Sequence, residues 1–161
     1  VGLLVSEDRS LHSYLPAYRR SRRVVGEQRG DAFMGTDFSM EDLSRLGFET
    51  DFSALKIGEN EDSVLLELTA IDPSTHRFPI LHLRVNRSNF LPSLVEHRDA
   101  AGQVHRRLIL EDVKEVDGHP FAHRIQLEDL VRSRVCTATI ESIEVNQGLP
   151  DRLFQVSNLH R

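Results

Sequence analysis

The sequence has 161 residues, of which 39% are hydrophobic and 28% are charged, and its formal net charge is -5 at pH 7. This length suits one domain with a sizeable core, and the composition is that of a globular protein rather than a disordered one. The acidic charge argues against nucleic acid as a partner, because nucleic-acid-binding domains carry a basic footprint. No apolar run approaches the roughly 20 residues of a membrane-spanning helix.

Alternation of apolar and polar residues, interrupted by turn residues, predicts a series of β-strands along most of the chain. Asp117-Gly118 is typical of a two-residue hairpin turn, and residues 99–102 carry a second turn signal. The predicted strands are residues 1–5, 11–15, 20–25, 52–57, 64–71, 79–86, 91–97, 104–116, 121–127 and 131–145. The pattern favours a mainly β (α+β) fold built on an antiparallel meander within one domain.

Two departures from simple alternation are expected. In the last predicted strand the apolar positions shift to Ile143 and Val145, which predicts a β-bulge near Ser142. Ser39, followed by Glu41 and Asp42, predicts the start of a short helix, and Gly47 is a suitable position for its end.

Residues 14–43 form the most distinctive stretch of the chain. After Val24-Val25 the alternation is lost, and a long loop with short helical character is expected. Long loops inside compact domains are usually functional or mobile. The loop carries an apolar tip, Phe33-Met34-Gly35, and it closes on Asp37-Phe38-Ser39.

An arginine cluster, Arg19, Arg20, Arg22 and Arg23, precedes this loop. Guanidinium groups bind phosphate or carboxylate bidentately, so the cluster could grip a lipid headgroup. Alternate residues of a strand share a face and adjacent ones do not, so all four cannot enter one pocket. The alternative is that these arginines are solvated or form ion pairs with the acidic residues between positions 31 and 42, and this arrangement is the more common one for surface charges.

Catalytic and metal-binding patterns are weak in this sequence. His119 and His123 have the spacing of a helical zinc pair, but on a strand residues four apart lie about 13 Å from each other. The sequence contains no G-x-S-x-G elbow and no glycine-rich phosphate loop. Cys136, the single cysteine, is expected to be a small buried apolar residue. We therefore expect no catalytic residue, metal or cofactor.

Several segments of the chain resemble segments of one protein family, and they occur in the same order along the sequence. They are YLPAYRRSRRV and RGDAFMGTDFSMEDL within residues 14–43, Phe90-Leu91-Pro92, residues 116–120 and residues 145–154. These segments are similar to those of the LolA-like outer-membrane lipoprotein-sorting proteins, relatives of the periplasmic carriers LolA and LolB. Relatives often carry a tryptophan before Tyr-Leu-Pro, whereas this chain has His12-Ser13 there.

The resemblance implies a strongly curved antiparallel sheet that forms an open half-barrel with a short helix or loop as a plug. It implies that residues 1–161 belong to a single LolA-like domain, of which they form the larger, C-terminal part. It also implies a signal peptide, a helix and strands upstream of Val1. A periplasmic location follows from the same resemblance.

A curved sheet has a concave face with more apolar side chains than one short helix can cover, and such clefts suit acyl chains. We expect Phe33, Met34 and Phe38 to form a gate supported by Tyr14 and Tyr18. Leu81, Leu83 and Phe90 are candidate walls of the acyl cleft. Arg22 and Arg29 are candidate contacts for a headgroup or a partner.

The function that these sequence features favour is a carrier that shields the acyl chains of a lipid or lipoprotein between membranes. The resemblance implies a membrane transporter or exporter as donor and an outer-membrane acceptor. The alternative is an envelope-stress sensor or adaptor that uses the same fold to bind a peptide or protein partner.

Overall fold

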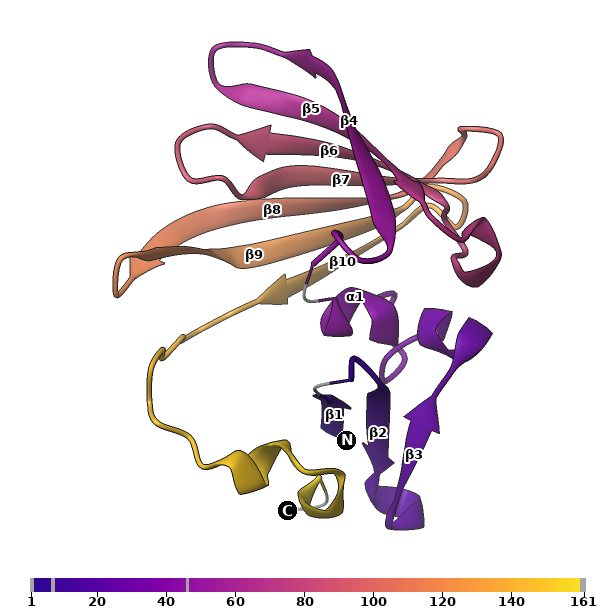
Figure 1. The fold of residues 1–161 in the computed structure, drawn as a ribbon, viewed down its shortest axis with the longest axis vertical. Coiled ribbons are helices and arrows are strands. Elements are labelled where there is room, and N and C mark those ends of the chain that lie inside the picture. Colours follow the sequence, from indigo (N-terminus) through magenta and orange to yellow (C-terminus); the bar gives the residue numbers. More distant parts are fainter. Residues whose placement is uncertain (1, 7, 46, 160–161) are drawn as a thin grey trace. The chain divides into compact units, whose positions relative to one another are not determined.

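The computed structural model of the chain describes residues 2–6, 8–45 and 47–159. Backbone contacts divide the chain into two compact units, residues 1–46 with 146–161 (unit 1) and residues 47–145 (unit 2) (Figure 1). The single domain expected from the sequence stays a prediction. Val1, in the first predicted strand, and Leu46, before the predicted end of the helix, lie outside the described residues.

Unit 1 contains a three-stranded antiparallel sheet in which β2 is the central strand. The strands are β1 (Gly2–Val5), β2 (Leu11–Leu15) and β3 (Arg20–Val24). Two 3-10 helices follow β2 and β3, namely η1 (Pro16–Tyr18) and η2 (Gly26–Gly30). Leu11, Val24 and Met40 form the buried core of this unit. The three predicted strands are confirmed.

A short helix, α1 (Met40–Ser44), follows the long loop of unit 1. The Oγ atom of Ser39 accepts the N–H of Asp42 at 3.1 Å, and a carboxylate oxygen of Asp42 accepts the N–H of Ser39 at 2.7 Å. This reciprocal capping box satisfies two N–H groups that a helix leaves free at its start. The predicted helix start at Ser39 is confirmed, and the helix ends before the predicted stop at Gly47.

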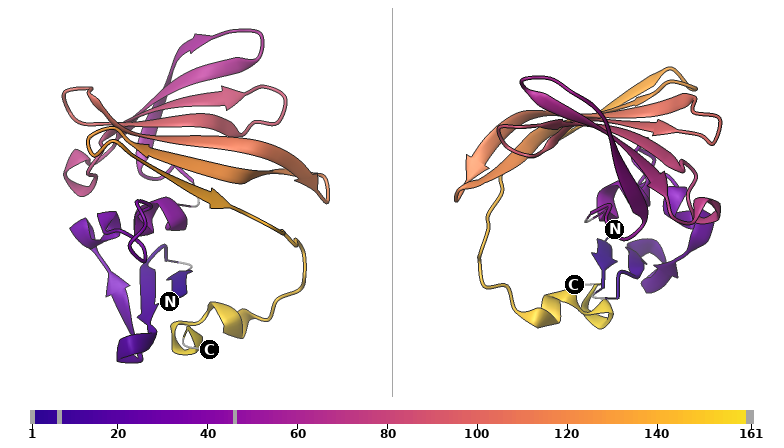
Figure 2. Two further views of the ribbon diagram at one scale, coloured as in Figure 1. Left: turned by 180° about the vertical axis from the view of Figure 1, so that it is seen from behind. Right: turned by 45° about the horizontal axis from the view of Figure 1, so that its top comes forward.

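Unit 2 is a seven-stranded sheet in which every strand pairs antiparallel with its neighbour in sequence, in the order β10-β9-β8-β7-β6-β5-β4. The sheet is strongly twisted and curved (Figure 2). Its strands are β4 (Phe52–Glu59), β5 (Ser63–Ala70), β6 (Ile80–Asn86), β7 (Pro92–Arg98), β8 (Val104–Val116), β9 (His119–Asp129) and β10 (Arg134–Thr139). A 3-10 helix, η3 (Pro73–Thr75), lies in the β5–β6 connection. The predicted antiparallel meander is confirmed.

The β8–β9 hairpin turns at Asp117-Gly118, as predicted. Both residues have positive φ, 50° and 77°, which a two-residue turn of this type requires and which glycine and aspartate tolerate. The two strands of the hairpin pair out to Val116 and His119.

The last predicted strand, residues 131–145, is wrong in both bounds. Asp129 Oδ1 accepts the N–H groups of Val131 and Arg132 at 3.0 and 2.8 Å, so a turn occupies the start of that range. Strand β10 ends at Thr139, and the predicted bulge near Ser142 lies in no strand. The remaining chain returns to unit 1, where η4 (Asp151–Phe154) and η5 (Val156–Asn158) follow.

Within the described residues, no helix combines the length and the apolar composition that crossing a bilayer requires.

Candidate functional site

One face of the sheet in unit 2 carries a large group of apolar side chains. The strand registers place Leu66 opposite Leu83, Leu83 opposite Val95, and Val95 opposite Leu108. Directly opposed side chains share a face of the sheet, so this row crosses four strands. The apolar residues that these registers bring to one side are called the apolar face: Leu66, Leu68, Leu81, Leu83, Val85, Val95, Leu108, Leu110, Ile125 and Leu127.

Some side chains of the apolar face are fully buried, and others are only half-buried. Leu81 and Leu83, two predicted cleft residues, are buried in its core cluster. Leu66, Leu108 and Leu110 pack against that cluster but are half-buried. The half-buried side chains leave apolar surface on which a further apolar group can pack.

Basic and aromatic side chains border the apolar face at one end. His97 lies opposite Leu81 on one side and opposite Arg106 on the other, and both polar residues are buried. The ring of Phe78 meets the ring of His97 edge to face, with 5.6 Å between centroids, and lies 5.9 Å from the guanidinium carbon of Arg106. Arg77 stacks over the same ring at 5.2 Å.

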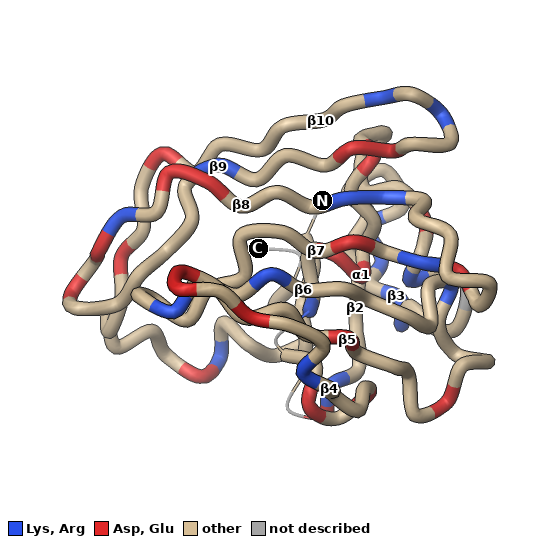
Figure 3. Tube along the Cα trace, turned by 90° about the horizontal axis from the view of Figure 1, so that it is seen from above, with Lys and Arg blue, Asp and Glu red and all other residues tan. Residues whose placement is uncertain are grey.

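The opposite face of the sheet carries a line of charged residues, which we call the charged ladder: Glu67, His82, Glu96, Arg107 and Glu128. Each of these residues lies directly opposite the next across strands β5 to β9. Nε2 of His82 lies 2.8 Å from Oε2 of Glu67, and Nε of Arg107 lies 3.1 Å from Oε1 of Glu96. Acidic and basic residues are interspersed along these strands (Figure 3).

Glu96, a member of the charged ladder, accepts hydrogen bonds from two arginines. Burial raises the pKa of its carboxyl, but hydrogen bonds from Arg98 and Arg107 outweigh burial and hold the pKa below its ordinary value. The Arg98 bond spans 2.5 Å. The carboxylate is therefore ionised at neutral pH, and this face of the sheet is unsuited to acyl chains.

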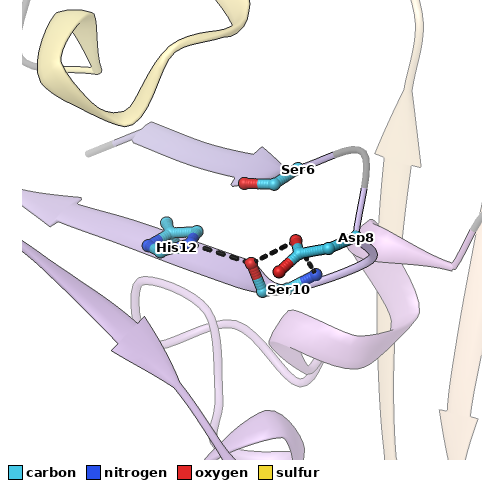
Figure 4. A pocket seen from close by; sticks show the side chains of 4 residues that line it. All are labelled: Ser6, Asp8, Ser10 and His12. Carbon is cyan, nitrogen blue, oxygen red and sulfur yellow. Dashed lines mark hydrogen bonds between the residues drawn. The ribbon is translucent and has the colours of Figure 1, made fainter.

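A shallow surface depression of about 570 Å³ in unit 1 is lined by Ser6, Asp8, Ser10 and His12 (Figure 4). Oγ of Ser10 lies 2.6 Å from Oδ1 of Asp8 and 3.0 Å from Nε2 of His12. The hydrogen bonds from the side chain and backbone of Ser10 lower the pKa of the Asp8 carboxyl.

This Asp-Ser-His arrangement differs from a catalytic triad. An ionised carboxylate can only accept, so the Ser10 hydroxyl donates to Asp8, and the His12 ring donates to the Ser10 oxygen. Activation of a serine nucleophile requires the imidazole to accept that proton. Within the part of the chain that the structure describes, no group of three or more His, Cys, Asp and Glu residues is placed to hold a metal ion.

The predicted gate residues lie in the long loop of unit 1. The N–H of Phe33 donates to the carbonyl of Phe38 at 2.7 Å, which closes the loop on itself. Phe38 is buried, and half-buried Phe33 packs on the core of unit 1. Met34 is 66% exposed and has φ of 52°, so the tip of the loop presents it to solvent.

The remaining predicted site residues lie at separate places. Tyr14 is half-buried on β2, and Tyr18 in η1 is exposed. Arg22 is exposed on β3, whereas Arg29 in η2 is half-buried with its Nε atom shielded from solvent and without an acceptor among the described residues. Phe90 is 81% exposed in the β6–β7 connection.

The sequence contained a signal for one cluster that the predictions missed. Asp8 precedes Ser10 by two residues, and an aspartate in a turn commonly accepts the N–H two residues on, as Oδ1 of Asp8 does from Ser10 at 3.0 Å. The charged ladder had no comparable signal, because Glu67 and His82 belong to different strands and meet only through the register.

Comparison with solved structures defines the class of fold. A domain from Vibrio parahaemolyticus named for outer membrane lipoprotein sorting matches with a TM-score of 0.82 at 24% identity, covering 94% of this chain. A DUF1329 family protein from Desulfovibrio piger matches with a TM-score of 0.86 at 22% identity, covering 97%. A LolA superfamily protein from Nitrosomonas europaea matches with a TM-score of 0.62 at 24% identity, covering 91%. The predicted LolA-like open half-barrel, mainly β and antiparallel, is confirmed.

The chain spans 66%, 67% and 66% of the lengths of these three structures, respectively. A family model described as "Uncharacterized protein" matches residues 2–161, and the chain belongs to that family. No curated protein matches the sequence.

Proposed function

We propose that the protein is a periplasmic carrier that binds the acyl chains of a lipid or lipoprotein on the apolar face of unit 2. The observation that carries this proposal is the division of one sheet into an apolar face and a charged ladder. Each CH₂ group that moves from water to the apolar face contributes about 0.8 kcal/mol. An acyl chain can therefore be held without any catalytic group, and the protein acts by binding rather than by turnover.

The LolA-like fold and the name of the Vibrio structural neighbour support a role in lipoprotein sorting. On this proposal, the cargo comes from a membrane transporter or exporter and passes to an acceptor at the outer membrane. Phe33, Met34 and Phe38 act as the gate, with Tyr14 and Tyr18 as its support. Arg22 and Arg29 contact the headgroup or the partner.

A matched pair of substitutions on β5 tests the proposal. Leu66 is half-buried on the apolar face, whereas its neighbour Leu65 is 37% exposed on the opposite face. Leu66→Lys should weaken the binding of a fluorescent acyl probe by at least about tenfold, because a charge then occupies the site. Leu65→Lys should leave binding unchanged. Thermal unfolding of both variants verifies that each is folded.

Equal affinity of the two variants for the probe would contradict the proposal. If Leu66→Lys is unfolded, Leu110→Lys replaces it, since Leu110 is half-buried on the same face. Ile109→Lys is then the control, because the register places Ile109 on the opposite face.

Phe90 favours a second candidate function, an adaptor that binds a peptide or protein in envelope-stress signalling. Its φ of 58° is unusual for an aromatic residue and costs roughly 1–2 kcal/mol. Exposed, preorganised aromatic side chains are typical anchors of protein interfaces. Native mass spectrometry and crosslinking of protein from its source cells distinguish the two candidates. A carrier should contain co-purified lipid. An adaptor should be free of lipid and should crosslink to an envelope protein.

A further inference from the structure

The side of the sheet that carries the apolar face changes in polarity along its strands. The registers connect one wholly apolar row through the middle of the sheet: Leu66, Leu83, Val95, Leu108 and Leu127. They connect a second row nearer the β5–β6 connection: Leu68, Leu81, His97, Arg106 and Asp129. This second row begins with leucines and ends with polar and charged groups, of which His97 and Arg106 are buried. An amphiphile has the same division along its length.

The ring of Phe78 joins the polar end of this side to its apolar part. The ring packs against the buried core cluster of the sheet. The rings of His97 and His105 meet it with 5.6 and 5.8 Å between centroids. The guanidinium carbons of Arg77 and Arg106 lie 5.2 and 5.9 Å from its centroid. Basic side chains therefore gather around one aromatic ring, to which a guanidinium group is attracted.

Carboxylates in the connections at this end of the sheet already have partners. The β5–β6, β7–β8 and β9–β10 connections lie here because neighbouring strands run antiparallel. Oδ1 of Asp72 accepts the N–H and the hydroxyl of Ser74 at 3.0 and 2.6 Å. Oδ2 of Asp99 lies 2.8 Å from Nε2 of His105. Oδ1 of Asp129 accepts two N–H groups of the turn that follows β9.

Arg77 differs from most arginines of unit 2. Arg87, Arg98 and Arg107 each bond to a glutamate. Arg77 is exposed and stacks on Phe78, and no carboxylate among the described residues forms an ion pair with it. A guanidinium group held on a ring can present its N–H groups to a phosphate or carboxylate in a bidentate way.

We propose that the cargo is an anionic amphiphile whose phosphate or carboxylate headgroup binds Arg77, while its chain runs past Phe78 along the apolar rows toward Leu110. This inference rests on the proposed carrier function and names the class of cargo. It favours a free anionic lipid over a lipoprotein, whose acyl chains are joined to a polypeptide. Arg22 and Arg29 of unit 1 are then left as contacts for a protein partner.

Amphiphiles with one chain and different heads test this inference on the full chain. Isothermal titration calorimetry measures the binding of dodecyl phosphate, of uncharged dodecyl glucoside and of inorganic phosphate, the first two below their micelle-forming concentrations. Dodecyl phosphate should bind at least about tenfold more tightly than dodecyl glucoside, because a charge-assisted hydrogen bond is added. Inorganic phosphate should show no binding. Inorganic phosphate that binds as tightly as dodecyl phosphate would overturn the inference, since the site would then take free phosphate.

A matched pair of arginine substitutions locates the headgroup. Arg77→Gln should remove most of the preference for dodecyl phosphate and leave the affinity for dodecyl glucoside unchanged. Arg84→Gln is the control, because Arg84 is exposed on β6 and lies opposite Leu65 and Leu94, on the other face of the sheet.

Two failures are distinguishable in this experiment. Equal affinity of the wild type for the two amphiphiles, or a preference that survives in Arg77→Gln, would overturn the inference and leave the carrier function in place. Failure of both amphiphiles to bind the wild type would overturn the carrier function itself.

Discussion

Glu96 and Arg107 lie directly opposite each other on β7 and β8, with 3.1 Å between Oε1 and Nε. The same carboxylate accepts a hydrogen bond from Arg98 at 2.5 Å. These bonds fix the centre of the charged ladder, and they make the two faces of the sheet chemically distinct. An amphiphile that meets this sheet has one face on which its acyl chain can pack.

Glu96→Gln should lower the free energy of unfolding by about 1.5–3 kcal/mol at pH 7, because charge-assisted hydrogen bonds are lost. Glu96 has a pKa held below its ordinary value, so its contribution is full above the unfolded-state pKa and is lost as the pH falls through the folded-state pKa. The difference between wild type and variant should therefore shrink in acid. Urea denaturation at a series of pH values measures it.

Glu111→Gln is the control for that change. Glu111 lies 3.4 Å from Nε of Arg124, but both side chains are about half exposed. An exposed pair contributes roughly 0–1 kcal/mol, so this variant should lose less stability than Glu96→Gln. A Glu96→Gln effect that stays constant between neutral and acid pH would show that the carboxylate charge is not what stabilises the ladder.

Ser39→Ala should destabilise unit 1 by about 1 kcal/mol, since the cap of α1 loses the acceptor for the Asp42 N–H. Ser88→Ala, at an exposed position in the β6–β7 connection, should be neutral. Hydrogen exchange of the α1 amides reports the loss locally. Unchanged protection of these amides in Ser39→Ala would mean that the capping box contributes nothing.

Ser13→Ala should be neutral or should raise the free energy of unfolding by up to about 1 kcal/mol. Ser13 is 0% exposed on β2, and its Oγ atom has no hydrogen-bond partner among the described residues. A buried hydroxyl without a partner costs about 1–3 kcal/mol, which offsets the small cavity that alanine leaves. Denaturant unfolding measures the change, and a clear destabilisation would reveal a partner for this hydroxyl.

Phenylmethylsulfonyl fluoride should leave Ser10 unmodified. The Ser10 proton is directed to the Asp8 carboxylate, whose pKa is lowered, so neither neighbour acts as a base toward the hydroxyl. Intact-mass measurement checks this. A mass increase that disappears in Ser10→Ala would contradict the geometry and would reopen the question of catalysis.

Local sequence signals were sufficient for most elements of the fold. The Ser39 helix start and the Asp117-Gly118 turn were predicted because capping and turn conformations depend on a few neighbouring residues. The last strand was misplaced because Asp129 caps a turn at Val131 and Arg132, and the apolar residues there resemble a strand in their pattern. The turn that the Asp129 side chain stabilises therefore determines the structure of this segment, although the alternation of apolar and polar residues predicts a strand there.

The candidate site was less predictable than the fold. Leu81 and Leu83 were identified because strict alternation on one strand defines a face. The charged ladder depends on the registers of four strand pairs, and a shift of one residue in any of them would separate its members. His97 and Arg106 likewise become neighbours only through the β7–β8 register.

Photo-crosslinking most directly tests the claim that the apolar face of unit 2 holds an acyl chain. A phospholipid with a diazirine near the end of one chain would be bound to the protein, irradiated and located by peptide mapping. The label should fall on residues of the apolar face, among them Leu66, Leu108 and Leu110. Labelling confined to the side of the charged ladder, or no labelling above that of an unfolded control, would contradict the account.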